Sequence, residues 1–212
     1  MWSAQIGVLP GATTAPTLYA LGDSMGAWAS RVLEEAPGGP LVVVGCSMGG
    51  SCALEMARQA GDRIAALMLV GTKAGHRPEP ELRDRYIADI RDGGGARIWP
   101  MMVNRFFSPT AAEGIALDAR AVALEQRADD LIQAMRAFHG RPDATDVASS
   151  WEKPLVVVNG DRDGFVSVAK ATALAATAPQ ARLHILPECG HFVNLERPAE
   201  FNALLVDLLG SV

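Results

Sequence analysis

A serine between small residues marks the part of the sequence best suited to chemistry. Gly45, Ser47 and Gly49 lie between an apolar run and an amphipathic stretch. A serine at such a sharp strand-to-helix turn takes a strained backbone conformation, and the positions two residues before and after it must be very small. The pattern predicts a nucleophilic hydroxyl at Ser47, with the Met48 N–H at the start of the helix directed at a developing oxyanion.

Two other interpretations of this turn have to be weighed. The serine could be idle in a glycine-rich turn, because a pentapeptide of this kind often occurs by chance. Its position after an apolar strand and before an amphipathic helix favours the nucleophile. A phosphate-binding loop is the other alternative, and it fails because no Gly-Lys-Ser/Thr sequence follows Gly49.

A nucleophilic serine needs a base and a group that orients the base. Asp163 follows one apolar run near the C-terminal end of the chain, and His191 follows the next. Both therefore lie at the carboxyl ends of predicted strands, where ligands bind in open parallel sheets. Ser47, Asp163 and His191 are predicted to face one edge in the chain order Ser, Asp, His. Asp161 is a second carboxylate in the same turn, and His191 could instead be a loop histidine that bonds to backbone.

Short apolar runs alternate with helical patterns along most of the chain. Such runs indicate strands that are covered on both faces, and their alternation with helices predicts an α/β fold with a mostly parallel sheet flanked by helices. Asp23 or Ser24 is the expected N-cap of the first helix, and Gly61 the expected C-cap of the second. The predicted strands cover residues 5–9, 41–44, 67–70, 155–158 and 182–186, and the predicted helices cover residues 23–35, 48–60, 166–178 and 198–209.

Residues 72–150 interrupt this alternation, because they contain no convincing strand. Three helices are predicted there, over residues 79–91, 96–107 and 110–139, with glycines at 93–95 and Pro109 as breaks. The chain is thus divided into a first core part (1–71), a helical insertion (72–150) and a second core part (151–212).

Composition excludes several classes of protein. The chain has 212 residues, of which 49% are hydrophobic and 20% charged, with a net charge of −5. These values exclude a disordered chain and a collagen-like fibre, and the scattered basic residues predict no nucleic-acid partner. No apolar run reaches about 18 residues and no secretion signal is recognised, so neither a membrane span nor export is expected. Three cysteines predict reduced thiols in a cytoplasmic protein.

No cofactor or metal is predicted. His76, His139 and His184 are isolated, with no carboxylate or cysteine at ligand spacing. Cys46, Cys52 and Cys189 are interpreted as small packing residues.

The sequence resembles the α/β-hydrolase superfamily, and within it the small lidded carboxylesterases, including pimeloyl-carrier methyl-ester esterases. The resemblance is carried by VLPGATTAP, VVVGCSMGGSCALEMA, VVVNGDRDGFV and PECGHFVNLERPAEF. It implies that Ser47 is the nucleophile, that His191 is the base, and that Asp163 rather than Asp161 is the acid, because the family's acid occupies the second carboxylate position of this turn. It also implies hydrolysis of a small-molecule ester with a small to medium acyl group, and it does not separate esters from thioesters, lactones or C–C bonds.

The sequence departs from that family at its beginning. The loop that supplies the family's second oxyanion donor would lie upstream of Met1. Either an N-terminal segment is missing, which would leave an exposed sheet edge and favour homo-oligomers, or the strand at residues 5–9 takes the vacant place. In the second case the turn at Pro10 and Gly11 would present the Ala12 N–H as the second donor.

Aromatic and sulfur-containing side chains in the insertion could bind the acyl group. Trp99, Met102 and Phe106 are the candidates, together with Met101 and Phe107, and packing within the helical lid is the other interpretation. A rival hypothesis for the whole protein is a non-catalytic α/β-hydrolase remnant that binds a small acyl ligand or a protein partner.

Overall fold

The computed structural model describes residues 1–8 and 11–212 of the chain. In this part, four strands form one parallel sheet in the order β1-β2-β3-β4. Their bounds are β1 Leu41–Cys46, β2 Ile64–Val70, β3 Leu155–Gly160 and β4 Ala181–Leu186. The predicted α/β class with a parallel sheet is confirmed.

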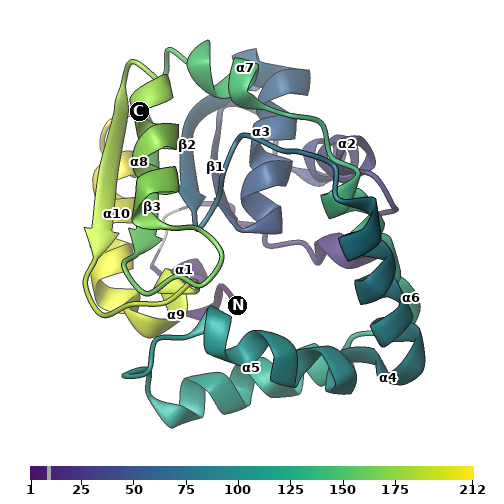
Figure 1. The fold of residues 1–212 in the computed structure, drawn as a ribbon. Coiled ribbons are helices and arrows are strands. Elements are labelled where there is room, and N and C mark those ends of the chain that lie inside the picture. The colour runs from purple at the N-terminus through teal and green to yellow at the C-terminus, as the bar shows by residue number, and fades with distance from the viewer. Residues whose placement is uncertain (9–10) are drawn as a thin grey trace.

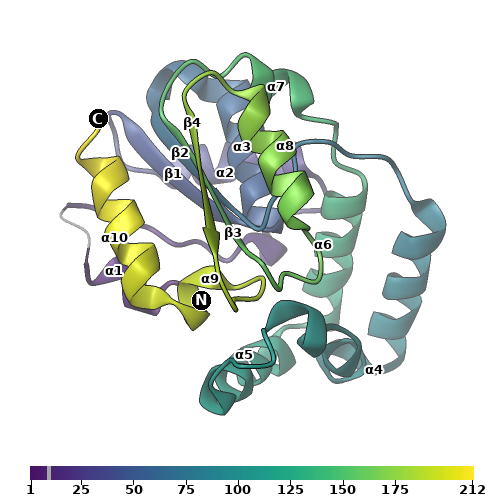
Figure 2. The ribbon, with the colours of Figure 1, turned by 60° about the vertical axis from the view of Figure 1, so that its left-hand side comes forward.

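Helices cover both faces of this sheet, and a further group of helices lies apart from it (Figure 1). Helices α2 (Met25–Glu35), α3 (Met48–Ala60) and α8 (Val168–Thr177) pack on one face, whereas α10 (Pro198–Leu209), α9 (Val193–Glu196) and α1 (Ser3–Ile6) lie on the other (Figure 2). The remaining helices are α4 Pro80–Phe106, α5 Glu113–Glu125, α6 Ala128–His139 and α7 Thr145–Ser149.

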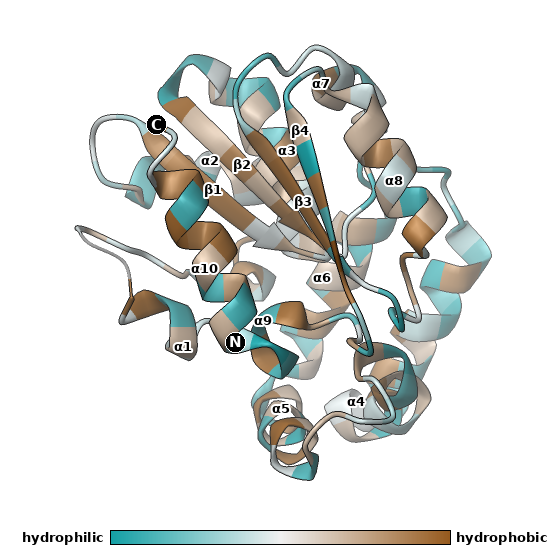
Figure 3. Ribbon diagram, turned by 90° about the vertical axis from the view of Figure 1, so that its left-hand side faces the viewer, coloured by the Kyte–Doolittle hydropathy of each residue, from teal (hydrophilic) through white to brown (hydrophobic). Residues whose placement is uncertain are grey.

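Burial along the strands explains why the sequence pattern identified them. All residues of β3 are buried, and so are all but one of β2, while β1 and β4 are mostly half-buried. In Figure 3 the strands are largely brown, and β4 carries some teal positions. The apolar runs of β2 and β3 therefore mark strands that are covered on both faces. The equally apolar run at residues 41–44 is expected from the sequence to be covered in the same way, but it is only half-buried because β1 is an edge strand of the described sheet. Within the described residues, β1 and β4 are the two edges of the sheet.

Two apolar cores stabilise the layers. The larger joins α2, α3 and α8 to one face of the sheet, and Trp28 is fully buried in it. The smaller joins α9 and α10 to the other face around the fully buried Phe201. Burying each side chain of this size contributes about 1.5–3 kcal/mol to stability, so both helical layers are held firmly on the sheet.

The predicted strand at residues 5–9 is wrong where the structure describes it, because Gln5 and Ile6 belong to helix α1. The side chain of Gln5 donates a 2.9 Å hydrogen bond to Asn202 Oδ1 of α10, and Trp2 packs on Phe201 with ring centroids 6.1 Å apart. Ile6 is 44% exposed instead of buried in a sheet. Leu9 and Pro10, the rest of the predicted strand and turn, lie outside the described residues.

The other predicted elements agree with the structure within a few residues, with two differences. Ser24 is the N-cap of α2 and accepts a hydrogen bond from Ala27 N at 3.2 Å. Gly61 is the C-cap of α3 as predicted, but its φ is −54° instead of left-handed, and the chain continues into a 3₁₀ turn. The helix predicted at residues 110–139 is two helices, α5 and α6, because Gln126 and Arg127 are extended.

Between β2 and β3 the chain is helical, as the sequence indicated. Helix α4 contains a break at Gly93 and Gly94, and Gly94 has a φ of +57°. Gly95 lies so close to helix α5 that a Cβ there would be 2.3 Å from the Ala123 carbonyl oxygen. No helix in the described part of the chain is long and apolar enough to cross a membrane.

Candidate active site

The turn at Ser47 has the strained geometry that the sequence predicted. Ser47 joins β1 to α3 with φ 54° and ψ −115°, a region that residues other than glycine rarely adopt. Its N–H donates a 2.8 Å hydrogen bond to the Val70 carbonyl of β2, and its carbonyl accepts from Gly50 N at 3.0 Å and Ser51 N at 3.1 Å. The strain is therefore held in place by backbone on both sides.

The glycines around the serine are required by space. A Cβ at Gly45 would lie 2.3 Å from the Gly49 carbonyl oxygen, and a Cβ at Gly50 would lie 1.9 Å from Thr72 Oγ1. Neither contact is possible without moving the turn. The steric requirement predicted for Gly45 is therefore met. At Gly49 a Cβ would meet only Leu18 Cδ1 at 3.8 Å, an ordinary contact, so Gly50 and not Gly49 is the second position that must lack a side chain.

His191 and Asp163 come together at the carboxyl edge of the sheet. His191 Nδ1 lies 2.7 Å from Asp163 Oδ2, and the side chains are 1% and 0% exposed. The other carboxylate oxygen, Oδ1, accepts from Phe165 N at 2.7 Å and from Val166 N at 2.9 Å. These bonds fix the carboxylate, which in turn fixes the plane of the imidazole and favours the tautomer with hydrogen on Nδ1.

Asp161, the alternative acid, is placed elsewhere. Its Oδ1 accepts a hydrogen bond from Cys189 N at 3.3 Å and lies 3.8 Å from Arg162 Nε, and a third of its side chain is exposed. Of the two carboxylates in this turn, Asp163 is the one that contacts the imidazole of His191.

The serine turn and the His–Asp pair meet across the end of β2. Gly71, next to the Val70 that binds Ser47, is so close to the pair that a Cβ there would lie 2.7 Å from the His191 ring and 3.1 Å from Asp163 Oδ2. The Cys46 thiol also lies 3.9 Å from the His191 carbonyl oxygen. These contacts place the Ser47 backbone and the His191 and Asp163 side chains around one short segment, Val70–Gly71.

The outer nitrogen of the imidazole is left free. His191 Nε2 is buried and has no hydrogen-bond partner among residues 1–8 and 11–212, so the bond to the Ser47 hydroxyl is not formed in this structure. Buried polar groups are nearly always paired, and an exception calls for a functional explanation. A base that receives its partner during the reaction is one such explanation, because catalytic hydrogen bonds are often long in the absence of substrate.

Of the two predicted oxyanion donors, Met48 lies at the start of a helix and Ala12 lies in an irregular segment. Met48 is the first residue of α3, where a backbone N–H has no acceptor within the helix and is directed outward. Ala12 is exposed in an irregular segment. No hydrogen bond of the described residues ties Ala12 to the serine turn, so its role stays a prediction.

An aromatic layer surrounds the imidazole. The rings of Phe165, Phe192 and Phe106 have centroids 4.9, 5.3 and 6.1 Å from that of His191. Phe106 belongs to the end of α4, and its carbonyl accepts a 2.7 Å hydrogen bond from His191 N. Trp99 packs on Phe106 at 6.1 Å, which brings two of the three predicted substrate-binding side chains into this layer. Met102, the third, is buried.

Glu196 is a residue of the site that sequence reasoning missed. Its Oε1 accepts from Gly190 N at 3.0 Å, and its Oε2 accepts from the Ser108 hydroxyl at 2.6 Å. The carboxylate thereby joins the loop before His191 to the end of the α4 segment. A Cβ at Gly190 would lie 2.7 Å from the Phe106 carbonyl oxygen and from Ser108 N, so backbone on both sides closes this corner. No signal in the sequence would pair Glu196 with Ser108.

The cysteines near the site are poorly suited to thiolate chemistry. Burial, and then the charge of Asp163, raise the pKa of the Cys46 thiol far above its usual value. Burial is also the main reason that the pKa values of Cys52 and Cys189 rise to about 12. All three are free thiols. Among the described residues, no group of three or more His, Cys, Asp or Glu could hold a metal ion.

Comparison with known proteins agrees with this geometry. Residues 7–204 match the model of the alpha/beta hydrolase family, and the chain belongs to that family. The predicted resemblance to its esterases is confirmed by a pimeloyl-[acyl-carrier protein] methyl ester esterase of Aromatoleum aromaticum, which is 28% identical over 95% of this chain and 85% of its own length.

Two further relatives show the range of the family. A 2-hydroxy-6-oxononadienedioate/2-hydroxy-6-oxononatrienedioate hydrolase of Cupriavidus pinatubonensis is 27% identical over 85% of this chain, which spans 65% of that protein's length. The solved structure of a thermophilic esterase from Thermogutta terrifontis superimposes with a TM-score of 0.82 at 26% identity, covering 93% of this chain and 75% of its own. The protein is thus a hydrolase with esterases among its relatives.

Proposed function

We propose that the protein hydrolyses carboxylic esters or thioesters of small to medium acyl groups through Ser47, His191 and Asp163. The observation that carries the proposal is the buried 2.7 Å contact between His191 and Asp163, with the other imidazole nitrogen unpartnered beside a strained serine turn. This is the arrangement that a base needs in order to take a proton from a hydroxyl.

The proposed reaction has two steps. His191 Nε2 takes the proton of the Ser47 hydroxyl while the serine oxygen attacks the carbonyl carbon, and Asp163 stabilises the charged imidazole. The imidazolium then returns the proton to the leaving alcohol or thiol, which leaves an acyl-enzyme. Water, deprotonated by His191, attacks the acyl carbon and releases the acid and the free serine.

Stabilisation of the oxyanion is assigned to the Met48 N–H, with the Ala12 N–H as the proposed second donor. A donor of this kind contributes about 10²–10³ in rate. Trp99 and Phe106 of the aromatic layer, together with the buried Met102, are proposed to receive the acyl chain. Such a wall suits an apolar acyl group better than a charged one. The names of the relatives, which include a methyl ester esterase, support ester chemistry.

The test uses p-nitrophenyl acetate and butyrate. We expect Ser47-dependent release of p-nitrophenol, and a loss of kcat/KM of at least about 10³-fold in Ser47→Ala, because the remaining groups cannot replace the nucleophile. Ser30→Ala is the matched control. Ser30 lies in helix α2, and its hydroxyl donates a hydrogen bond to Gln59 Oε1 instead of taking part in the Ser47 turn. Hydrolysis that is equal in both variants would rule out the proposed nucleophile and favour a non-catalytic role.

A further inference from the structure

A second site lies outside the serine turn. A cavity of about 530 Å³ opens between the loop after β2, the end of α6 and helix α8, and neither Ser47, Asp163 nor His191 lines it. Four cationic side chains contribute to its wall, namely Lys73, Arg77, Arg141 and Lys170. We call it the cationic cavity. In a chain whose net charge is −5, this gathering of positive charge is local.

The carboxylates of the wall do not balance these charges. Glu79 and Asp143 are the two that line the cavity. Both oxygens of Asp143 are occupied by backbone, since Oδ2 accepts from His76 N at 2.8 Å and Oδ1 from Thr145 N at 2.9 Å. Hydrogen bonds from Thr145 and His76 lower the pKa of Asp143 to about 2, so this carboxylate stays ionised while it organises the loop.

Arg141 is a buried cation without a carboxylate partner. It is 5% exposed, donates to the Phe138 carbonyl and lies with its guanidinium 3.9 Å from the centre of the Phe138 ring. It forms no ion pair within 4.0 Å with any carboxylate of the described residues. Burial lowers its pKa to about 10, while the negative charges of Asp143 and Glu79 act in the opposite direction without forming an ion pair with it. A buried charge normally requires a partner of opposite sign.

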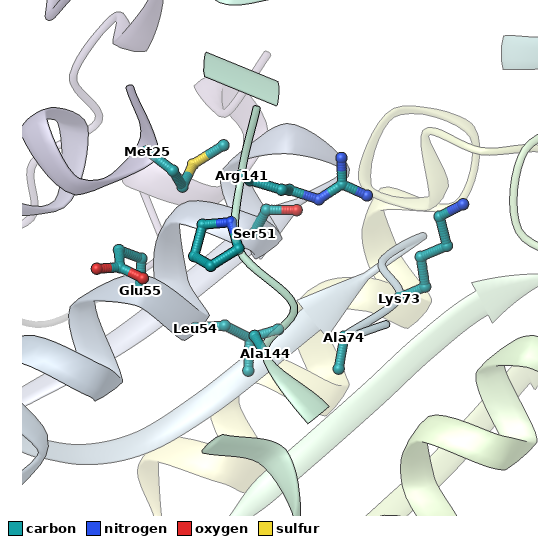
Figure 4. Close-up of a pocket in the computed structure, with 9 residues that line it drawn as sticks. Met25, Ser51, Leu54, Glu55, Lys73, Ala74, Arg141 and Ala144 are labelled. Atoms are coloured by element: carbon teal, nitrogen blue, oxygen red, sulfur yellow. The ribbon is translucent and has the colours of Figure 1, made fainter. Parts of the chain in front are cut away.

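Lys73, also in the wall of the cavity, is a second cation that forms no ion pair with a carboxylate of the described residues. Burial lowers its pKa, the charges of Lys170 and Arg141 lower it further, and the charge of Glu79 offsets part of this effect. Within the described residues, neither Lys73 nor Lys170 makes an ion pair within 4.0 Å. Figure 4 shows a smaller adjoining pocket, in which Lys73 and Arg141 extend to the same side while Glu55 lies on the opposite side. In this view both cationic side chains extend away from Glu55, the one carboxylate drawn.

We propose that the cationic cavity binds a small organic anion through a carboxylate or phosphate group. An oxyanion there would accept hydrogen bonds from the lysines and the guanidinium and supply the missing countercharge. Phe138, Ala173 and Leu174 form an apolar part of the wall, which gives the carbon skeleton of such a ligand a place to pack. The volume matches that of small-molecule sites in general.

The experiment is a calorimetric titration with inorganic phosphate and, separately, with succinate, at constant ionic strength with chloride as the balancing anion. We expect saturable binding of at least one anion, weakened at least tenfold in Lys73→Gln and in Lys170→Gln. Arg120→Gln is the matched control, because it removes one positive charge from the exposed surface of α5. Ser47→Ala should bind as the unmodified protein does, so this site and the proposed hydrolysis succeed or fail separately.

Two results would overturn the proposal. One is the absence of saturable binding of either anion to the unmodified protein. The other is binding that neither lysine substitution weakens more than Arg120→Gln does, which would indicate a general effect of charge. The two lysines are partly or fully exposed, so both variants are expected to fold, and their thermal unfolding provides the check.

Discussion

The carboxyl edge of the sheet and helix α5 are held in opposite ways. At the sheet edge, a Cβ at Gly45 would overlap backbone, and one at Gly71 would overlap His191. In α5 no residue is buried, Leu117 is 57% exposed, and a Cβ at Gly114 would meet nothing within 4 Å. Added side chains are therefore excluded by contact at the sheet edge, where the Ser47 turn and the His191–Asp163 pair must be placed accurately. In α5 there is space for such substitutions.

The largest expected effect concerns the carboxylate. Asp163→Asn keeps the shape of the side chain but removes the charge that holds the imidazole in its tautomer, so we expect kcat to fall about 10⁴-fold. Asp161→Asn is the matched control in the same turn, and it should change kcat by less than about threefold, because Asp161 bonds Cys189 N instead of His191. Hydrolysis of p-nitrophenyl butyrate measures both. A larger fall in kcat in Asp161→Asn than in Asp163→Asn would indicate that Asp161, not Asp163, is the acid.

Two glycine substitutions, one in each region, test the contrast in stability. Gly45→Ala places a Cβ 2.3 Å from the Gly49 oxygen, and overpacking of this kind costs about 1–3 kcal/mol of stability or more, with displacement of the serine. Gly114→Ala, within α5, should instead raise the free energy of unfolding by about 0.5–1 kcal/mol, because alanine favours a helix. Urea unfolding measures both. Equal effects of the two changes would remove the contrast between the regions.

A smaller effect is expected at Glu196, which ties the loop before His191 to the segment between α4 and α5. In Glu196→Gln an amide replaces the carboxylate that accepts from Gly190 N and Ser108, and we expect kcat to fall about tenfold with little change in KM, since a charge-assisted bond contributes about 1.5–3 kcal/mol. Glu200→Gln, on the exposed start of α10, is the control. A change in KM alone, with kcat preserved, would contradict a role in holding the His191 loop.

The sheet could be predicted because its strands are short apolar runs, of which the two central ones are buried on both faces. Apolar runs marked β2 and β3, and the start of α10 at Pro198 follows from the preference of proline for the first helical turn. Helix α1 could not be predicted, because amide contacts of Gln5 with α9 and α10 hold it there, and such long-range pairs leave no periodic trace. The break between α5 and α6 carries no glycine or proline signal either.

Some residues of the candidate site could also be predicted from the sequence, and others could not. Ser47, Asp163 and His191 could be found because each follows a strand, and parallel strands bring their carboxyl ends to one edge. Glu196 could not, since Ser108 is far from it in the sequence. The cationic cavity was equally hidden, because Lys73, Arg141 and Lys170 come from three separate segments that only the folded chain brings together.

The pairing of β2 with β3 has a consequence for the order of folding. These neighbours in the sheet are separated along the chain by residues 71–154. Doubling the length of a closed loop costs only about 0.6 kcal/mol of entropy, so the long detour hardly affects equilibrium. It does affect kinetics, because distant pairings slow the search. The β1–α3–β2 unit is local and can form early, whereas the imidazole and its carboxylate reach the serine only after the distant half of the chain has joined.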